Sequence, residues 1–305
     1  MKSASNTEPS RGFMIGQAPM RAKPLEPALY LVATPIGNLG DITLRALEVL
    51  AAADVLACED TRVTRILLER YGIHRRTTAY HEHNAAEAGP RLIAELEAGN
   101  SVALVSDAGT PLISDPGFRL VDAVLAAGIK VVPLPGASSV LAALTASGLP
   151  SDAFFFAGFL PVKDGQRKTR LMEMAPVPGT LVFLESPRRL AASLAAMAKV
   201  LGNRAAAVCR ELTKAFEEVR RGDLAELAAH YESAGAPKGE IVICIAPPVA
   251  EIMDHSPEDT DRMLLSLAAE MSASKAAAEA ARMTGGRKGD LYRRLLELKD
   301  DAGGA

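Results

Sequence analysis

The sequence contains no tryptophan, and aromatic residues make up only 4% of its 305 positions. Proteins that hold single-stranded nucleic acids by stacking need exposed aromatic rings for the bases to lie against. A chain so poor in aromatics has little stacking surface. If it contacts a nucleic acid, we expect recognition through shape, phosphate and sugar contacts.

Cysteines are also few, and the three present are Cys58, Cys209 and Cys244. They lie in or next to apolar runs, at spacings that fit neither a disulfide framework nor a zinc site. His81 and His83 stand two positions apart, but a metal centre needs further ligands that the sequence does not obviously supply, so we expect none. The pattern favours core thiols in a reducing, cytoplasmic environment.

Long apolar runs are missing too. No stretch approaches the ~20 apolar residues needed to cross a bilayer, and the first residues lack the apolar core of a signal peptide. Residues 1–27 are polar and contain prolines, which predicts a disordered tail. We therefore expect no contact with a membrane.

The chain carries no overall positive charge, because its formal net charge is −3. This argues against a protein that coats nucleic acid with its whole surface. Between residues 273 and 299, however, seven basic residues face three acidic ones, a local charge of +4. The seven are Lys275, Arg282, Arg287, Lys288, Arg293, Arg294 and Lys299. Both a solvated helix face and an RNA-binding surface fit this pattern.

What the chain does have is length and apolar content. With 305 residues and 49% hydrophobic residues it can bury two or three cores. Short β-rich runs alternate with amphipathic helical segments, which is typical of an α/β protein. We expect α/β domains at 28–150 and 151–248, and a helical domain at 255–300 that resembles a helix-turn-helix around Thr284-Gly285-Gly286. The helical pair could dock on RNA, or only pack on its parent domain or a partner.

The most informative segment is 106–117, Ser-Asp-Ala-Gly-Thr-Pro-Leu-Ile-Ser-Asp-Pro-Gly, which follows an apolar strand at 102–105. In an open α/β sheet, ligands bind beyond the carboxyl ends of the strands. Gly109 has no Cβ, so a ligand can approach its backbone closely, and Asp107 supplies an anionic group. We predict a ligand-binding loop here.

The end of this loop has the composition of a helix start. Asp115 can cap the following helix, with Pro116 at its first position. The apolar residues predicted for its buried face are Phe118, Leu120, Val121 and Val124.

This loop, together with the segments 34–41 and 133–139, resembles the tetrapyrrole-methylase superfamily of S-adenosylmethionine-dependent methyltransferases. From about residue 29 onward the chain is most similar to the small-subunit ribosomal RNA 2′-O-methyltransferase I family, which methylates a cytidine ribose. The resemblance implies a two-domain, class III methyltransferase fold with a small C-terminal helical domain. It also implies S-adenosyl-L-methionine as cofactor, small-subunit ribosomal RNA or the 30S particle as partner, and a homodimer. The segment 34–41 departs from the superfamily turn, because Ala33 and Pro35 replace its first two glycines and Asn38 its aspartate.

Methyl transfer from a sulfonium needs mainly orientation and a pocket poor in water. The residues expected at the cofactor all lie in or near the three matched segments or at the first strand of the second domain. They are Ile36, Gly37, Ser106, Asp107, Ala108, Gly109, Leu112, Ile113, Ser138, Ser139, Phe159 and Leu160. For Leu112, Ile113 and Phe159, ordinary core packing is an equal alternative.

A ribose hydroxyl is a poor nucleophile, so a positioned base would help to remove its proton. Asp60 matches the position of a superfamily acid-base carboxylate, and His81 and Glu211 are further candidates. Asp60 could instead only cap a helix, and His81 could be an ordinary surface residue. The residues predicted to bind the substrate are Arg62, Lys214, Arg287 and Lys288.

The leading hypothesis is therefore an enzyme that methylates a cytidine ribose 2′-hydroxyl in 16S ribosomal RNA. One alternative is a tetrapyrrole (uroporphyrinogen or precorrin) methyltransferase, which would show no dependence on RNA. Another is a non-catalytic RNA-binding assembly factor, which would bind particles without consuming the cofactor.

Overall fold

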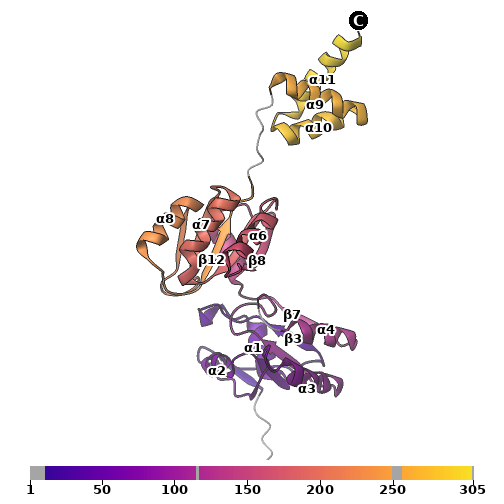
Figure 1. Ribbon diagram of the computed structural model, residues 1–305. Coiled ribbons are helices and arrows are strands. Elements are labelled where there is room, and N and C mark those ends of the chain that lie inside the picture. Colours follow the sequence, from indigo (N-terminus) through magenta and orange to yellow (C-terminus); the bar gives the residue numbers. More distant parts are fainter. Residues whose placement is uncertain (1–10, 115–116, 249–255, 304–305) are drawn as a thin grey trace, which may run out of the picture. The chain divides into compact units, whose positions relative to one another are not determined.

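The computed structural model describes residues 11–114, 117–248 and 256–303, and the chain divides into two compact units, Met1–Pro248 and Val249–Ala305. The first unit is α/β and holds two five-stranded sheets, and the second is helical (Figure 1). Within the described residues, no helix is both long and apolar enough to cross a membrane.

The first sheet is entirely parallel, with the strand order β5-β4-β6-β3-β7. Its strands are β3 (Leu29–Val32), β4 (Val55–Cys58), β5 (Thr77–Ala79), β6 (Val102–Val105) and β7 (Val131–Leu134). All four residues of β6 are buried, as expected for a strand covered on both faces.

Alternate residues of these strands enter two separate cores. Leu56 and Cys58 pack with α1 (Leu44–Ala52) and α2 (Thr61–Arg70) on one face. Ala57 packs with α3 (Ala85–Glu97) and α4 (Phe118–Ala126) on the other. Because all five strands run in the same direction, the loops that follow them lie at one edge of the sheet.

The second sheet has the order β11-β10-β12-β9-β8, in which only β8 and β9 are parallel. Its strands are β8 (Phe154–Phe159), β9 (Thr180–Glu185), β10 (Ala205–Arg210), β11 (Glu218–Asp223) and β12 (Ile241–Ile245). One face packs against α6 (Asp164–Met174), α7 (Leu190–Leu201) and α8 (Leu224–Ala234).

The other face of this sheet is covered by α5 (Ser139–Ser147), which precedes the expected domain boundary at 150. Val140, Ala143 and Leu144 of α5 pack against second-sheet residues such as Val182 and Val242. The same core includes Ile36, which comes from the loop after β3. The loop after β3 and helix α5 thus share a core with the second sheet.

The N-terminal residues contradict the expectation of a disordered tail through residue 27. β1 (Gly12–Ile15) and β2 (Ala18–Arg21) form an antiparallel hairpin. Phe13 is only 3% exposed and packs in the core beside α1, and the Met14 N–H donates to the Tyr71 carbonyl. The polar composition hid this hairpin, because between residues 11 and 22 only Phe13 and Ala22 are buried. Residues 1–10 lie outside the described part.

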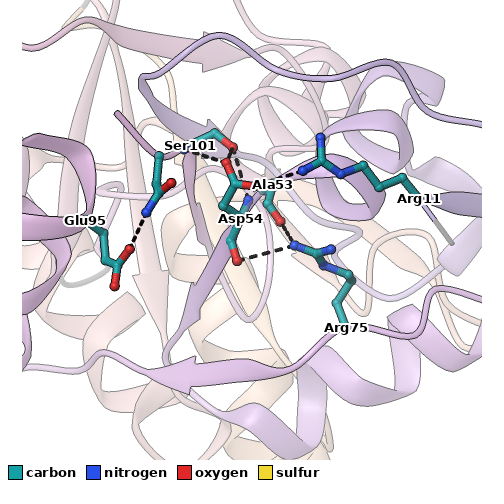
Figure 2. A network of polar contacts seen from close by, with 7 residues as sticks. Arg11, Ala53, Asp54, Arg75, Glu95 and Ser101 are labelled. Carbon is teal, nitrogen blue, oxygen red and sulfur yellow. Dashed lines mark hydrogen bonds and ion pairs between the residues drawn. The ribbon is translucent and has the colours of Figure 1, made fainter. Parts of the chain in front are cut away.

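Polar contacts fix the start of the hairpin to the first sheet (Figure 2). Arg11 Nη2 lies 3.1 Å from Asp54 Oδ1, and Asp54 Oδ2 accepts hydrogen bonds from Ser101 N–H and Oγ at 2.9 and 2.6 Å. Arg75 donates to the Ala53 and Asp54 carbonyls. Burial alone would raise the pKa of Asp54, but the Ser101 hydrogen bonds and Arg11 hold that pKa below its ordinary value.

Helix α4 starts later than expected. It begins at Phe118 behind Gly117, whose φ is 131°, so the expected start at Pro116 is wrong; Asp115 and Pro116 themselves lie outside the described residues. Phe118 is 74% exposed rather than buried. Leu120 and Val124, four residues apart, form the buried face, and Phe118 points away because the helical repeat is 3.6 residues.

The second unit consists of α9 (Pro257–Glu270), α10 (Ala273–Thr284) and α11 (Lys288–Gly303). The predicted pair of helices around a glycine turn is confirmed, and Gly285 ends α10 with φ 70°. The core of this unit contains Leu264, Ala276, Ala277, Ala280, Leu291 and Leu295. Arg294 pairs with Asp261 at 2.6 Å and so joins α11 to α9.

Candidate active site

The loops after β3 and β6 lie side by side at the carboxyl edge of the first sheet. Thr34 N–H donates to the Gly109 carbonyl at 2.9 Å, and Gly109 N–H donates to the Thr34 carbonyl at 3.0 Å. Gly109 has φ +83°, a conformation that favours glycine. Because both of its backbone groups are used, this glycine joins the two loops; its N–H and carbonyl already have protein partners.

A cavity of about 230 Å³ lies between these loops, α2 and the second sheet; we call it the Ile36 cavity. Its walls include several predicted cofactor residues, namely Ile36, Gly37, Ser106, Asp107 and Ala108. Sequence reasoning missed the part of the wall formed by Val63, Thr64, Ile66 and Leu67 of α2, and also Glu240.

A second cavity, of about 430 Å³, adjoins the carboxyl ends of β4, β5 and β6; we call it the His81 cavity. It is lined by Glu59, Asp60, Thr61, Arg62, Ala79, His81, His83 and Asp107. Asp107 lines both cavities. Two neighbouring cavities that share one carboxylate suit a reaction between two bound molecules.

Asp107 also organises the chain around it. Its Oδ1 accepts a hydrogen bond from the backbone N–H of Asp60 at 3.0 Å. The loops after β4 and β6 are thereby connected, and the N-terminus of α2 is held beside the Ile36 cavity.

Asp60 caps the N-terminus of α2, as the alternative interpretation of this residue predicted. Its Oδ1 accepts from the Arg62 N–H at 2.8 Å, and its Oδ2 lies 2.6 Å from Arg62 Nη2. These bonds to Arg62 hold the pKa of Asp60 at about 2. A carboxylate with so low a pKa is a poor proton acceptor near neutral pH. A role for Asp60 as a base therefore requires that Arg62 be drawn away.

His81 is the second candidate base that lines this cavity. Its Nδ1 is buried and has no hydrogen-bond partner within the described part of the chain. The backbone beside it is fixed, because His81 N–H donates to Asn84 Oδ1 at 2.8 Å and Asn84 Nδ2 donates to the Ala79 carbonyl at 2.9 Å. Buried polar atoms without a partner are few in native proteins and call for a ligand or water.

The loop after β10 closes over the loop after β3. Lys214 Nζ lies 2.9 Å from Glu211 Oε1 and 3.1 Å from Glu240 Oε2. The Lys214 side chain lies on Gly37, and Thr213 Oγ1 accepts from the Asn38 N–H at 3.2 Å.

The ion pairs of Lys214 with Glu211 and Glu240 keep these side chains charged. Burial alone would lower the pKa of Lys214, but its hydrogen bonds with Glu211 and Glu240 raise it. The hydrogen bond from Lys214 lowers the pKa of Glu211. Glu211, predicted as a candidate base, is thus committed to an ion pair.

Backbone strain is concentrated in two loops of this region. Among the described residues, the non-glycine residues with positive φ are Leu112 (73°), Ser114 (60°), Glu211 (51°) and Thr213 (68°). Such conformations cost about 1–3 kcal/mol each and cluster at functional sites. Their positions support a functional role for both loops.

The remaining predicted cofactor residues differ in their surroundings. Ser138 caps α5, which begins at Ser139. Thr110 Oγ1 donates to the Ala137 carbonyl at 3.2 Å, so the segment 106–117 contacts the segment 133–139. Phe159 is 57% exposed at the end of β8, whereas Leu160 is 3% exposed and packs in the core of the second sheet. This favours a packing role for Leu160.

Leu112 and Ile113 lie in the loop that follows Gly109. Leu112 is half-buried and lines a third cavity, which also includes Glu59, while Ile113 is 48% exposed.

The predicted substrate residues Arg287 and Lys288 belong to the second unit, at the start of α11. Both are exposed, and neither forms an ion pair with another described residue. No group of three or more His, Cys, Asp or Glu residues within the described part could hold a metal ion.

Comparison with known proteins identifies the family. The model described as Tetrapyrrole (Corrin/Porphyrin) Methylases matches residues 28–228, and the model described as RsmI C-terminal HTH domain matches residues 254–299. The Ribosomal RNA small subunit methyltransferase I of Mesorhizobium japonicum is 70% identical over 291 residues, covering 95% of this chain and 98% of the relative. The protein of the same name from Vibrio cholerae is 48% identical and covers 89% of this chain and 95% of the relative.

Among solved structures, the uroporphyrin-III C-methyl transferase of Thermus thermophilus, complexed with S-adenyl homocysteine, matches with a TM-score of 0.51. It is 22% identical and covers 71% of this chain and 96% of its own, so this likeness shows the fold alone. With a methylase model matching most of the first unit and a relative 70% identical over nearly its whole length, the chain belongs to the tetrapyrrole methylase family, in the branch of the ribosomal RNA small subunit methyltransferases I.

Proposed function

We propose that the protein transfers a methyl group from S-adenosyl-L-methionine to the ribose 2′-hydroxyl of a cytidine in 16S ribosomal RNA. The single observation that carries the proposal is that Asp107 lines two adjoining cavities at the carboxyl edge of the parallel sheet. The names of the relatives support ribosomal RNA as the substrate class.

The Ile36 cavity fits a cationic donor. Ile36 and Pro35 supply apolar surface, and Asp107 supplies a carboxylate. Lys214 also lines the cavity, but Glu211 and Glu240 balance its charge, so it would not repel a cation. The bound donor would supply an activated methyl group on its sulfonium, with Ile36, Gly37, Ser106, Asp107 and Ala108 as the residues that hold it.

The His81 cavity would then take the target ribose. His81 lines this cavity and would accept the 2′-hydroxyl proton, and Asp60 would become a second acceptor once a substrate phosphate pairs with Arg62. A positioned base contributes about 10²–10⁴-fold to such a reaction. As the bond between the ribose oxygen and the methyl carbon forms, the bond from that carbon to the sulfonium sulfur would break and leave S-adenosylhomocysteine as a neutral thioether. Loss of the hydroxyl proton would leave the methylated ribose neutral.

The test is transfer of labelled methyl groups to small-subunit particles that lack the modification. We expect label at one cytidine ribose, located by mapping the modified nucleotide. Label on a base, or no label with intact protein and donor, would refute the proposal.

The basic residues of the second unit favour RNA over a tetrapyrrole as substrate. A chain shortened to residues 1–248 should keep donor binding, because the first unit has its own cores, and should lose methylation of the particle. A tetrapyrrole methyltransferase would be active without RNA. A non-catalytic assembly factor would not bind S-adenosylmethionine, which calorimetry would show.

We further propose that the protein acts in the cytoplasm as a homodimer. β8 is an edge strand and bears three exposed phenylalanines, Phe154, Phe155 and Phe159. Exposed apolar edge strands favour association. Sedimentation should give twice the chain mass, and a monomer at micromolar concentration would contradict this proposal.

A further inference from the structure

A second basic segment lies in the first unit. Residues 61–76 contain five arginines and one glutamate, a net charge of +4 with histidine neutral, in a chain whose net charge is −3. The arginines are Arg62, Arg65, Arg70, Arg75 and Arg76. The charge is thus concentrated on α2 and the loop after it.

The helix presents most of this charge to solvent. Its buried residues are Thr64, Leu67 and Leu68. Arg62, Ile66 and Arg70 recur every four residues and so share the opposite face. At 1.5 Å per residue, Arg62 and Arg70 are separated by about 12 Å along the helix.

The ion pairs of these arginines are weak or exchangeable. Arg62, with its side chain 82% exposed, pairs with Asp60. Arg65 lies 3.8 Å from Glu69, both about two-thirds exposed, and Arg70 has no ion-pair partner within the described part of the chain. Exposed pairs of this kind contribute little. Arg75 differs, because it is tied to the Ala53 and Asp54 carbonyls.

The exposed face of α2 continues directly into both cavities. Arg62 lines the His81 cavity, and Val63 and Ile66 line the Ile36 cavity. Val63 is 42% exposed and Ile66 60% exposed. An apolar strip flanked by arginines therefore leads away from the site.

We propose that this α2 surface, consisting of Arg62, Val63, Arg65, Ile66 and Arg70, binds the phosphate backbone of the RNA strand next to the target nucleotide. The inference rests on the proposed function. The arginines would pair with successive phosphates, while Val63 and Ile66 would contact the sugars between them. A phosphate on Arg62 would compete with Asp60 for the guanidinium, so RNA binding would also free the Asp60 carboxylate.

The test compares full-length R65Q/R70Q, together with the single variants R65Q and R70Q, with R91Q as a single-charge control on another helix. Arg91 is likewise an exposed helical arginine, 76% exposed and paired four residues away with Glu87, but it lies on α3. The probes are an RNA fragment containing the target and the unmodified particle, and the readouts are affinity at several salt concentrations, KM, kcat and donor affinity.

We expect R65Q/R70Q to raise KM for the particle several-fold and to leave donor affinity and kcat unchanged. For single-stranded RNA, each lost phosphate contact makes the plot of log K against log salt concentration shallower by about 0.7. Loss of the two contacts of Arg65 and Arg70 should therefore make the slope shallower by about 1.4. R91Q should match the wild type. Thermal melting checks that all variants fold.

A KM and salt slope equal to those of R91Q would overturn the α2 surface and leave the proposed function standing, provided that the wild type methylates RNA. A weaker particle affinity with an unchanged salt slope on RNA would assign α2 to a protein contact, and that also overturns the proposal. Failure of the wild type to methylate RNA overturns both.

Discussion

Asp107 holds the backbone of Asp60, with its Oδ1 3.0 Å from the Asp60 nitrogen. The carboxylate predicted to bind the donor therefore also positions the residue predicted to act as a base. A substitution of Asp107 should therefore affect both donor binding and the position of Asp60.

We expect Asp107→Ala to abolish measurable donor binding in calorimetry and to slow methyl transfer further by loosening the Asp60 loop. The lost hydrogen bond should lower the free energy of unfolding by about 1 kcal/mol. Asp107→Asn is the matched control, since it keeps an acceptor oxygen and removes the charge. It should bind the donor weakly with near-normal stability, and wild-type donor affinity in Asp107→Asn would exclude a role for the charge.

Arg62→Gln should raise the pKa of Asp60 from about 2 toward 3.8, because the side-chain hydrogen bonds from Arg62 are the largest cause of the low value, while the backbone N–H of residue 62 remains as a donor. With a depressed folded-state pKa, the stabilisation from this pair is present above about pH 3.8 and is lost as the pH falls through about 2. Carbon-13 NMR titration of the carboxylates, assigned with Asp60→Asn, measures the shift. An unchanged pKa in Arg62→Gln would show that Arg62 does not control this carboxylate.

Gly37→Ala should damage the junction between the two sheets. A Cβ at this position would overlap Lys214 Cγ and lie 2.7 Å from Lys214 Cε, and φ is +154°. Overpacking of this kind costs about 1–3 kcal/mol. In a Lys214→Ala background the same change should cost less, as measured by urea unfolding. Equal costs in the two backgrounds would mean that Lys214 does not lie on Gly37.

Phe13→Ala should destabilise the protein by about 3–5 kcal/mol, the usual cost of removing a buried phenylalanine. Ile15→Ala, at a hairpin position that is 38% exposed, should change stability by less than about 0.5 kcal/mol. Urea denaturation distinguishes the two. If Phe13→Ala were as mild as Ile15→Ala, the hairpin would not be part of the first core.

Local sequence was sufficient for much of the fold. The apolar run at β6 and the glycine turn at Gly109 are adjacent in the chain, so a strand followed by a loop could be predicted from composition alone. The two-sheet α/β fold and the C-terminal helices could be predicted for the same reason. The capping alternative for Asp60 was also visible, because it depends only on residues two positions apart.

Contacts between distant segments could not be predicted in this way. Phe13 was assigned to a tail because its burial depends on α1, which follows later in the chain. Lys214 on Gly37 and the α2 wall of the Ile36 cavity depend on how the second sheet packs against the first. Periodicity would have placed Ile66 opposite the buried Thr64 and Leu68, but not beside a cavity.

Helix α5 comes from the first half of the chain and covers the second sheet, which limits how the enzyme can be divided. A fragment ending at residue 150 would leave Val140, Ala143 and Leu144 uncovered, and one starting at 151 would bare Val182 and Val242. We expect neither fragment to be soluble on its own. Split reporters, domain exchanges with other methylases and gene fusions should therefore be joined after residue 248, where the first compact unit ends.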